Sequence, residues 1–243
     1  MLRKGMLWPT LATAVGLAIL LGLGFWQLQR LAWKEGLIAQ LATRATAKPV
    51  ALEPVLQAAA EGADSEYTHV FATGKFRHDL ERYVYFPGQG DWGYHVITPL
   101  ELSDGRAILI NRGYVPRQLR DPAKRREGSP VGAVAITGLL RRNPPDRPWY
   151  IPAADPKTMT WNWPEMGDIA RSTYGASRTV VGDLSIDADP ASPGSVPAGG
   201  ATRLELSNRH LEYALTWFAL AAALVGVYAY AAIRHLWNAS PAK

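Results

Sequence analysis

The sequence contains no cysteine, and this absence excludes several classes of site at once. Structural disulfides, zinc held by thiolates, iron–sulfur clusters, a CxxCH haem attachment and a CxxxC copper site all require thiols. Histidine and methionine are also scarce, with 5 and 4 residues in a chain of 243. A copper carrier that relied on these two residue types is therefore disfavoured.

The sequence also lacks the common catalytic patterns, since no Ser-His-Asp, HExxH or phosphate-loop motif occurs in it. We therefore expect a protein that is not an enzyme. The formal net charge is +5, but basic and acidic residues are interspersed along the chain. The densest basic run, Arg117 to Arg126, contains Asp121 and Pro122 and is interpreted as a solvated loop. Without a recognition motif, this charge does not predict nucleic-acid binding.

Two long apolar segments bracket the polar middle of the chain, from Leu7 to Leu28 and from Leu211 to Ile233. Each is long enough for about 20 helical residues to cross a hydrocarbon core of roughly 30 Å. Two spans place both termini on one side of a membrane and the whole middle on the other. The first segment ends in the aromatic and basic stretch Phe25 to Arg30 rather than in a small-residue cleavage site, which favours an uncleaved span.

Basic residues outside the two spans predict their orientation. The positive-inside rule places the termini in the cytoplasm, because Arg3, Lys4, Arg234 and Lys243 flank the spans. No Arg-rich presequence precedes the first span, so we expect a bacterial inner (plasma) membrane. The predicted order is a cytoplasmic N-terminus (1–6), a transmembrane helix (7–28), a β-rich periplasmic domain (29–207), a second transmembrane helix (208–233) and a cytoplasmic C-terminus (234–243).

Alternating apolar and polar residues predict a β-rich middle domain, so the expected fold class is an α+β membrane protein in which a transmembrane helix hairpin flanks that domain. The pattern does not decide between a closed barrel and an open antiparallel sheet. The predicted strands are 67–76, 82–86, 94–100, 107–111, 133–142, 179–186 and 201–206. The predicted helical stretches are a continuation of the first span to about residue 44, then 52–60 and 168–174.

Two further packing expectations follow from residue size. Small residues four positions apart, at Ala14, Ala18 and Gly22 and at Ala222 and Gly226, favour close contact between the two membrane helices. The tryptophans of the Pro-rich stretch 143–164, Trp149, Trp161 and Trp163, are expected to be buried.

His210 is the one histidine in an unusual position, at the start of the second span. An ionisable side chain at membrane depth is costly and is a functional candidate by default. On a helix, Tyr213, Ala214 and Trp217 share its face, which would suit a flat apolar macrocycle with the imidazole as axial iron ligand. The alternative is a histidine hydrogen-bonded at the lipid headgroups. The other histidines, His69, His78, His95 and His235, are interpreted as satisfied, exposed or interfacial residues.

Three spaced motifs carry a resemblance to a known family. They are Gly24 to Lys34, then Gly93 and Ile97 to Leu100 with Ile110 to Pro116, and finally Asn208 to Phe218. Over nearly its whole length the chain resembles the surfeit-locus-1 family of cytochrome c oxidase assembly proteins. Tyr114 stands where the familiar form of the middle motif has tryptophan. Arg112 and the pair Trp26 and Trp33 match motif residues, for which sheet packing and interface anchoring are the structural alternatives.

The resemblance implies an assembly factor that binds haem a and promotes its insertion into subunit I of cytochrome c oxidase. It places the proposed iron ligand on His210. Our own hypothesis adds that Tyr213 and Trp217 would pack on the porphyrin and that Arg209 or Arg203 would meet a propionate. Subunit I, haem a synthase and membrane lipid are the implied partners. The alternative is a haem-free membrane scaffold that stabilises an assembly intermediate of subunit I.

Overall fold

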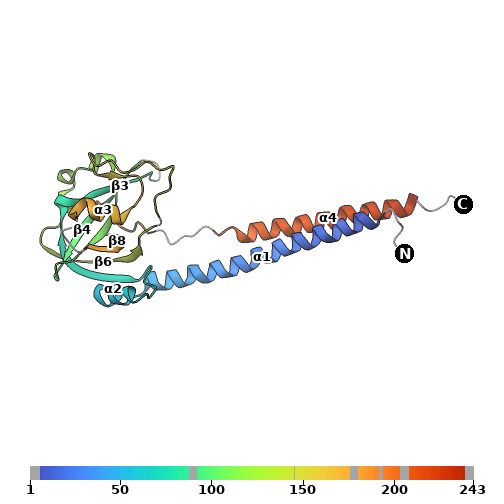
Figure 1. Ribbon diagram of the computed structural model, residues 1–243, viewed down its shortest axis with the longest axis horizontal. Coiled ribbons are helices and arrows are strands. Elements are labelled where there is room, and N and C mark those ends of the chain that lie inside the picture. Colours follow the sequence, from blue (N-terminus) through green and yellow to red (C-terminus); the bar gives the residue numbers. More distant parts are fainter. Residues whose placement is uncertain are drawn as a thin grey trace. The chain divides into compact units, whose positions relative to one another are not determined.

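A computed structural model of the protein describes residues 6–87, 92–144, 146–175, 180–191, 194–202 and 208–238 (Figure 1). The chain divides into two compact units. One comprises Met1–Gln40 and Glu205–Lys243, and the other comprises Leu41–Leu204. The predicted strand at 201–206 lies mostly outside the described residues, as do Arg203 and Ser207.

The first unit is a pair of long helices, α1 (Leu7–Thr46) and α4 (His210–Asn238). Both are long and apolar enough to cross a membrane. Large apolar side chains such as Leu11, Ile19, Leu215 and Val227 remain exposed on them, as expected for lipid-facing surfaces. The predicted continuation of the first helix beyond its apolar segment is confirmed, because α1 runs without interruption to Thr46.

The two helices contact each other along a seam that repeats every seven residues. Gly24 is buried against the ring of Phe218, and Gly16 faces Leu224. The hydroxyls of Thr10 and Tyr228 share a hydrogen bond. The buried and half-buried seam positions include Thr10, Leu17, Gly24 and Leu31 of α1 and Ala214, Ala221 and Tyr228 of α4. This heptad spacing is the pattern of left-handed helix packing.

The predicted contact through Ala14, Ala18 and Gly22 is wrong. These residues are exposed, and a side chain added at Gly22 would meet nothing within 4 Å. Ala222 and Gly226 are exposed as well. A four-residue step advances about 40° beyond one full turn, so a row of such steps drifts away from a seam that repeats every seven residues. The hairpin packing is present, but Gly24, Ala214 and Ala221 supply its small residues.

The second unit is built around a closed ring of five strands. In this ring β2 pairs with β6, β6 with β8, β8 with β5, β5 with β4, and β4 again with β2. All pairs are antiparallel except β5 with β8. The described strands are β1 (Val50–Ala51), β2 (His69–Phe76), β3 (Arg82–Phe86), β4 (Gly93–Leu102), β5 (Ala107–Pro116), β6 (Ala133–Arg142), β7 (Thr160–Trp161) and β8 (Val180–Ala188). The sequence did not decide between a closed barrel and an open sheet, and the structure forms the closed barrel.

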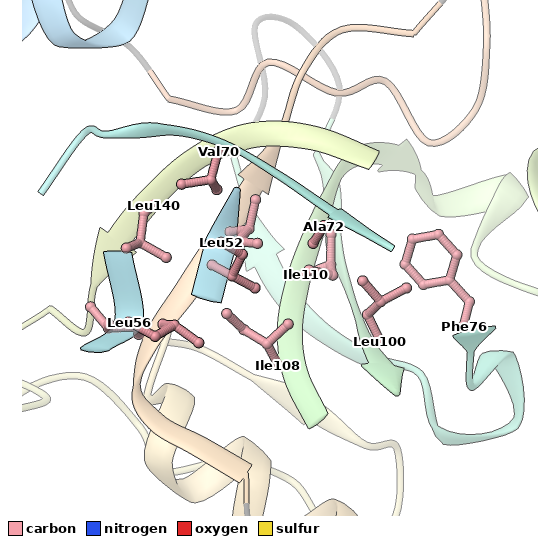
Figure 2. Packing of buried hydrophobic residues seen from close by; sticks show 11 residues of the cluster. Leu52, Leu56, Val70, Ala72, Phe76, Leu100, Ile108, Ile110 and Leu140 are labelled. Atoms are coloured by element: carbon pink, nitrogen blue, oxygen red, sulfur yellow. The ribbon is translucent and has the colours of Figure 1, made fainter. Parts of the chain in front are cut away.

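The barrel interior is filled by the inward-facing residues of these strands. Along β2 every second residue is buried, which is the alternation on which its prediction rested. The helix α2 (Leu52–Ala60) contributes Leu52 and Leu56 to the same cluster, where Figure 2 shows them among the strand side chains. The described strand members of this cluster are Val70, Ala72, Phe76, Leu100, Ile108, Ile110, Leu140, Leu184 and Ile186.

A second apolar cluster lies beneath the helix α3 (Met166–Tyr174). Ile169 of α3 is fully buried and packs with Trp161 and with Ile97 of β4. The expected burial of Trp161 is confirmed, whereas Trp149 is 93% exposed and contacts the ring of Tyr150 edge-on. The sequence signal failed at Trp149 because burial of an aromatic ring depends on partners from other elements. The indole of Trp161 has such partners and donates a hydrogen bond to Asp168.

Candidate functional site

The start of α4 is held to α1 by one polar contact between side chains far apart in the sequence. Nδ1 of His210 lies 2.7 Å from Oε1 of Gln27. An amide oxygen only accepts, so Nδ1 carries the hydrogen, and in the neutral ring the lone pair is on Nε2. Within the described part of the chain, no residue hydrogen-bonds Nε2. A histidine oriented by a second side chain in this way is prepared to ligate a metal through its other nitrogen.

The aromatic residues near His210 differ in exposure. Tyr213 is 51% exposed and Trp217 is half-buried, while Ala214 between them is fully buried in the seam. Tyr213 therefore presents its ring outward, whereas Ala214 serves helix packing. Together with His210, this part of α4 offers an imidazole beside accessible aromatic surface.

Arg209, the predicted propionate contact, is already engaged. Its Nε and Nη2 donate to Oε2 of Glu212 at 2.9 and 2.7 Å, and both side chains are largely exposed. An exposed pair of this kind is weak, so a carboxylate ligand could compete with Glu212 for the guanidinium. Arg203, the other predicted contact, lies outside the described residues.

His210 also differs from a conventional metal site. No group of three or more His, Cys, Asp or Glu side chains able to hold a metal ion occurs among the residues described. One imidazole does not retain a bare ion, but it is sufficient for a haem iron, because the porphyrin supplies the equatorial ligands. The donor set here therefore fits a haem.

The remaining histidines of the domain have partners, in agreement with the prediction. His69 lies between the Ala47 carbonyl and Asp189, at 2.8 Å from each. Burial lowers its pKa, but these two acceptors outweigh that effect and hold the pKa above its usual value. His78 contacts Glu81 and the Pro130 carbonyl, and the ring of His95 stacks on Phe86.

The middle motif shapes the barrel rather than a catalytic centre. The amide of Asn111 donates to Asp187 of β8 at 2.9 Å and accepts the backbone N–H of Gly113. Gly113 has a φ of 104°, and a side chain there would collide with the Ala198 carbonyl. Structural roles thus account for both residues.

Arg112 of the same motif leads to a buried charge cluster that sequence reasoning missed. The Glu81 carboxylate, 2% exposed, accepts hydrogen bonds from Arg112 and from Arg125, whose side chain is 1% exposed. Thr98, His78 and the hydroxyl of Tyr83 also contact this carboxylate. Burial pushes the pKa of Glu81 upward, but the hydrogen bonds from His78 and Arg125 and the nearby charges outweigh it, so the pKa lies below its usual value. Burial and the charge of Arg125 lower the pKa of Arg112 to about 10, so it remains charged at neutral pH.

This cluster corrects the interpretation of the basic run as a solvated loop. Arg125 is buried and donates through Nε to the Leu119 carbonyl at 3.0 Å. Arg112 donates to the Gly128 carbonyl, and the Tyr83 hydroxyl donates to the Arg120 carbonyl at 3.1 Å. The loop is therefore fixed from below, whereas the side chains of Arg117, Lys124 and Arg126 are exposed. The basic run gave no hint of this, because its anchor Glu81 belongs to a different part of the sequence.

Comparison with known proteins gives consistent matches over most of the chain. A sequence profile of the SURF1 family matches residues 14–222. The chain is 33% identical over 238 residues to a SURF1-like protein of Monosiga brevicollis, covering 93% of this chain and 87% of the relative. It is also similar to Surfeit locus protein 1 of Mus musculus, at 36% identity over 83% of this chain and 68% of the relative. Surfeit locus protein 1 of Homo sapiens is 35% identical, with 83% and 70% covered. The profile match includes the barrel domain, Gln27 and His210.

Proposed function

Because the chain belongs to the SURF1 family, we propose that it is a membrane-anchored assembly factor for cytochrome c oxidase that binds haem a through His210 and promotes its insertion into subunit I. The observation that supports haem binding is the contact between Gln27 and His210. It orients the imidazole and leaves Nε2 for an axial bond to the iron of the haem cargo.

The surroundings of His210 support the same assignment. The exposed ring of Tyr213 offers apolar contact to one side of a macrocycle, and Trp217 adds a half-buried ring one turn further along α4. Arg209 could exchange Glu212 for a propionate, since charge-assisted hydrogen bonds form with either carboxylate.

The location proposed for this activity is a bacterial inner membrane, with the barrel domain in the periplasm. The two apolar helices support the membrane anchor. Exposed Trp26 and Trp33 near the polar end of the apolar segment of α1, with Arg30 stacked 3.9 Å from the Trp33 ring centroid, are typical of a membrane interface.

The test is an absorption spectrum of the detergent-purified protein after co-expression with a haem a synthesis pathway. We expect the wild type to carry haem a and His210→Ala to lose most of it. His235→Ala, which removes the other histidine of α4, should retain wild-type haem content. Gln27→Leu should weaken binding by about tenfold or more, because the His210 imidazole would lose the hydrogen bond that orients it.

Other results would contradict this assignment. Wild-type haem content in His210→Ala would exclude His210 as the ligand. A haem-free wild type would favour the scaffold, in which the protein stabilises a subunit I intermediate without touching haem. Cross-linking to subunit I that persists in haem a–depleted cells would identify that function.

A further inference from the structure

We propose that the loop Arg117–Arg126, together with the aromatic side chains beneath it, is a docking surface for an acidic segment of a protein partner. The name basic platform is used here for Arg117, Arg120 and Lys124 above Tyr83, Trp92 and Tyr94. It belongs to the barrel domain and makes no use of His210. The proposal therefore adds a partner site to the proposed function without depending on haem binding.

The basic platform presents positive charge that the protein neutralises only in part, since Asp155 interacts electrostatically with Arg120 without forming an ion pair. An open cleft of about 660 Å³ is lined by Tyr83, Arg117, Gln118, Arg120, Asp121 and Lys124. Within the described ranges, none of its three cations forms an ion pair. Arg120 donates only to the Thr158 carbonyl and the Thr160 hydroxyl. Asp121, the one acid in the lining, is exposed and accepts the Ala123 N–H at 2.9 Å.

Two of the three cations rest on aromatic rings. The Arg117 guanidinium lies 4.7 Å from the Trp92 ring centroid, and that of Arg120 lies 4.5 Å from Tyr83 and 4.9 Å from Tyr94. The rings continue outward to Tyr85, which like Trp92 is 40% exposed. Trp, Tyr and Arg are the residue types enriched at the energetic centres of protein interfaces. This composition favours a protein partner over a free inorganic anion.

The basic platform is also held in place before any partner binds. The buried pair of Arg125 and Glu81 lies under the loop, and Arg125 and Tyr83 hydrogen-bond the carbonyls of Leu119 and Arg120. A surface that is already ordered loses little conformational entropy on association. A loop of exposed cations that served only solubility would not need this buried support.

The arrangement of the cations indicates the form of the ligand. They lie on two successive short turns, η2 (Arg117–Leu119) and η3 (Pro122–Lys124), and on the residue Arg120 between them. Charges distributed along an open cleft suit a row of carboxylates better than one compact anion. An acidic segment with interspersed aromatic or apolar residues matches both the cations and the rings.

The experiment measures binding of a short fluorescein-labelled peptide of alternating glutamate and tyrosine to the full-length protein in detergent. The test variant is Arg117→Gln with Lys124→Gln. The matched control is Lys48→Gln with Lys75→Gln, which removes the same charge from exposed positions elsewhere in the domain. We expect the test variant to bind about tenfold more weakly and the control to bind as the wild type does. Binding should also weaken as salt is raised.

Three results would overturn the proposal. An equal loss of peptide affinity in both variants would show that only the net charge of the protein matters. Unchanged peptide affinity in the test variant would exclude the basic platform as the binding surface. Vesicles of anionic phospholipid that bind through Arg117 and Lys124, while the peptide does not bind, would assign the surface to lipid. The test variant should keep the haem content of the wild type, because the basic platform makes no use of His210. A negative result in the peptide assay can therefore be told apart from a negative result in the haem assay of the proposed function.

Discussion

Glu81 is the residue on which the buried charge of the domain converges. Its carboxylate is nearly inaccessible and lies among Arg112, Arg125 and His78. A buried carboxylate is costly unless cationic partners compensate its charge. The buried guanidinium of Arg125 likewise needs the charge of Glu81. The motif residue Arg112 thus has a structural role, because it joins the central strand β5 to this cluster.

Replacing Glu81 by Gln should lower the free energy of unfolding at neutral pH by about 3–5 kcal/mol, because it leaves Arg125 buried without a counter-charge. Folding lowers the pKa of Glu81, so the ionised carboxylate contributes fully to the free energy of unfolding above its unfolded-state pKa of about 4.3. This contribution is lost as the pH falls through the lower pKa of the folded state. The wild type should therefore lose stability as the pH falls below about 4.3, and the stability of Glu81→Gln should depend less on acid. Urea titrations followed by tryptophan fluorescence across this pH range measure both effects.

The matched control for this prediction is Glu53→Gln. Glu53 pairs with Arg106, but its side chain is 63% exposed. Its loss should change stability by less than about 1 kcal/mol. Equal effects of the two substitutions would show that the Glu81 cluster is no more important than a surface pair.

Single-residue chemistry was only partly predictable. His210 could be singled out because an ionisable residue at the edge of an apolar segment is conspicuous. Its partner Gln27 could not, since 183 residues separate the two and glutamine at a helix surface carries no signal of its own. The same holds for Glu81 and Arg125, which only the folded barrel brings together.

At the scale of elements, the seam between α1 and α4 depends on one close approach. A methyl group added to Gly24 would lie 2.5 Å from Cε1 of Phe218. Gly24→Ala should therefore force the helices apart or displace the Phe218 ring, at a cost of about 1–3 kcal/mol. Gly22→Ala is the matched control, because nothing lies within 4 Å of the added group. Unfolding of the purified protein in SDS, followed by circular dichroism, should show an earlier midpoint for Gly24→Ala alone.

Individual strands and helices were largely predictable, and their assembly was not. Alternation located β2, β3 and β6 closely, and turn residues located the hairpin between β4 and β5. Barrel closure rests on three residue pairs between β2 and β4, including Phe76 with Leu100. Such a short non-local contact leaves no periodic trace in the sequence. The parallel pairing of β5 with β8 is equally non-local.

At the scale of the whole molecule, the absence of cysteine gives a direct test of topology. Any introduced cysteine is the only thiol, so Lys157→Cys in the domain and Arg234→Cys near the end of α4 can each be probed separately. Both positions are exposed. A membrane-impermeant maleimide should label Lys157→Cys in intact spheroplasts and Arg234→Cys only after permeabilisation. The opposite pattern would invert the proposed orientation, and labelling of both positions without permeabilisation would contradict the hairpin.

The polar contacts of the helix pair have a consequence for where His210 lies in a membrane. Thr10 meets Tyr228 near one end of the seam, and Gln27 meets His210 near the other. If one helix slid by a heptad, about 10 Å, both of these contacts between the helices would be lost, and only the Thr10 hydroxyl would keep a partner, the Met6 carbonyl. The two polar contacts therefore fix the position of one helix along the axis of the other. A ligand bound at His210 would be held at one depth in the bilayer, set by the length of the two helices.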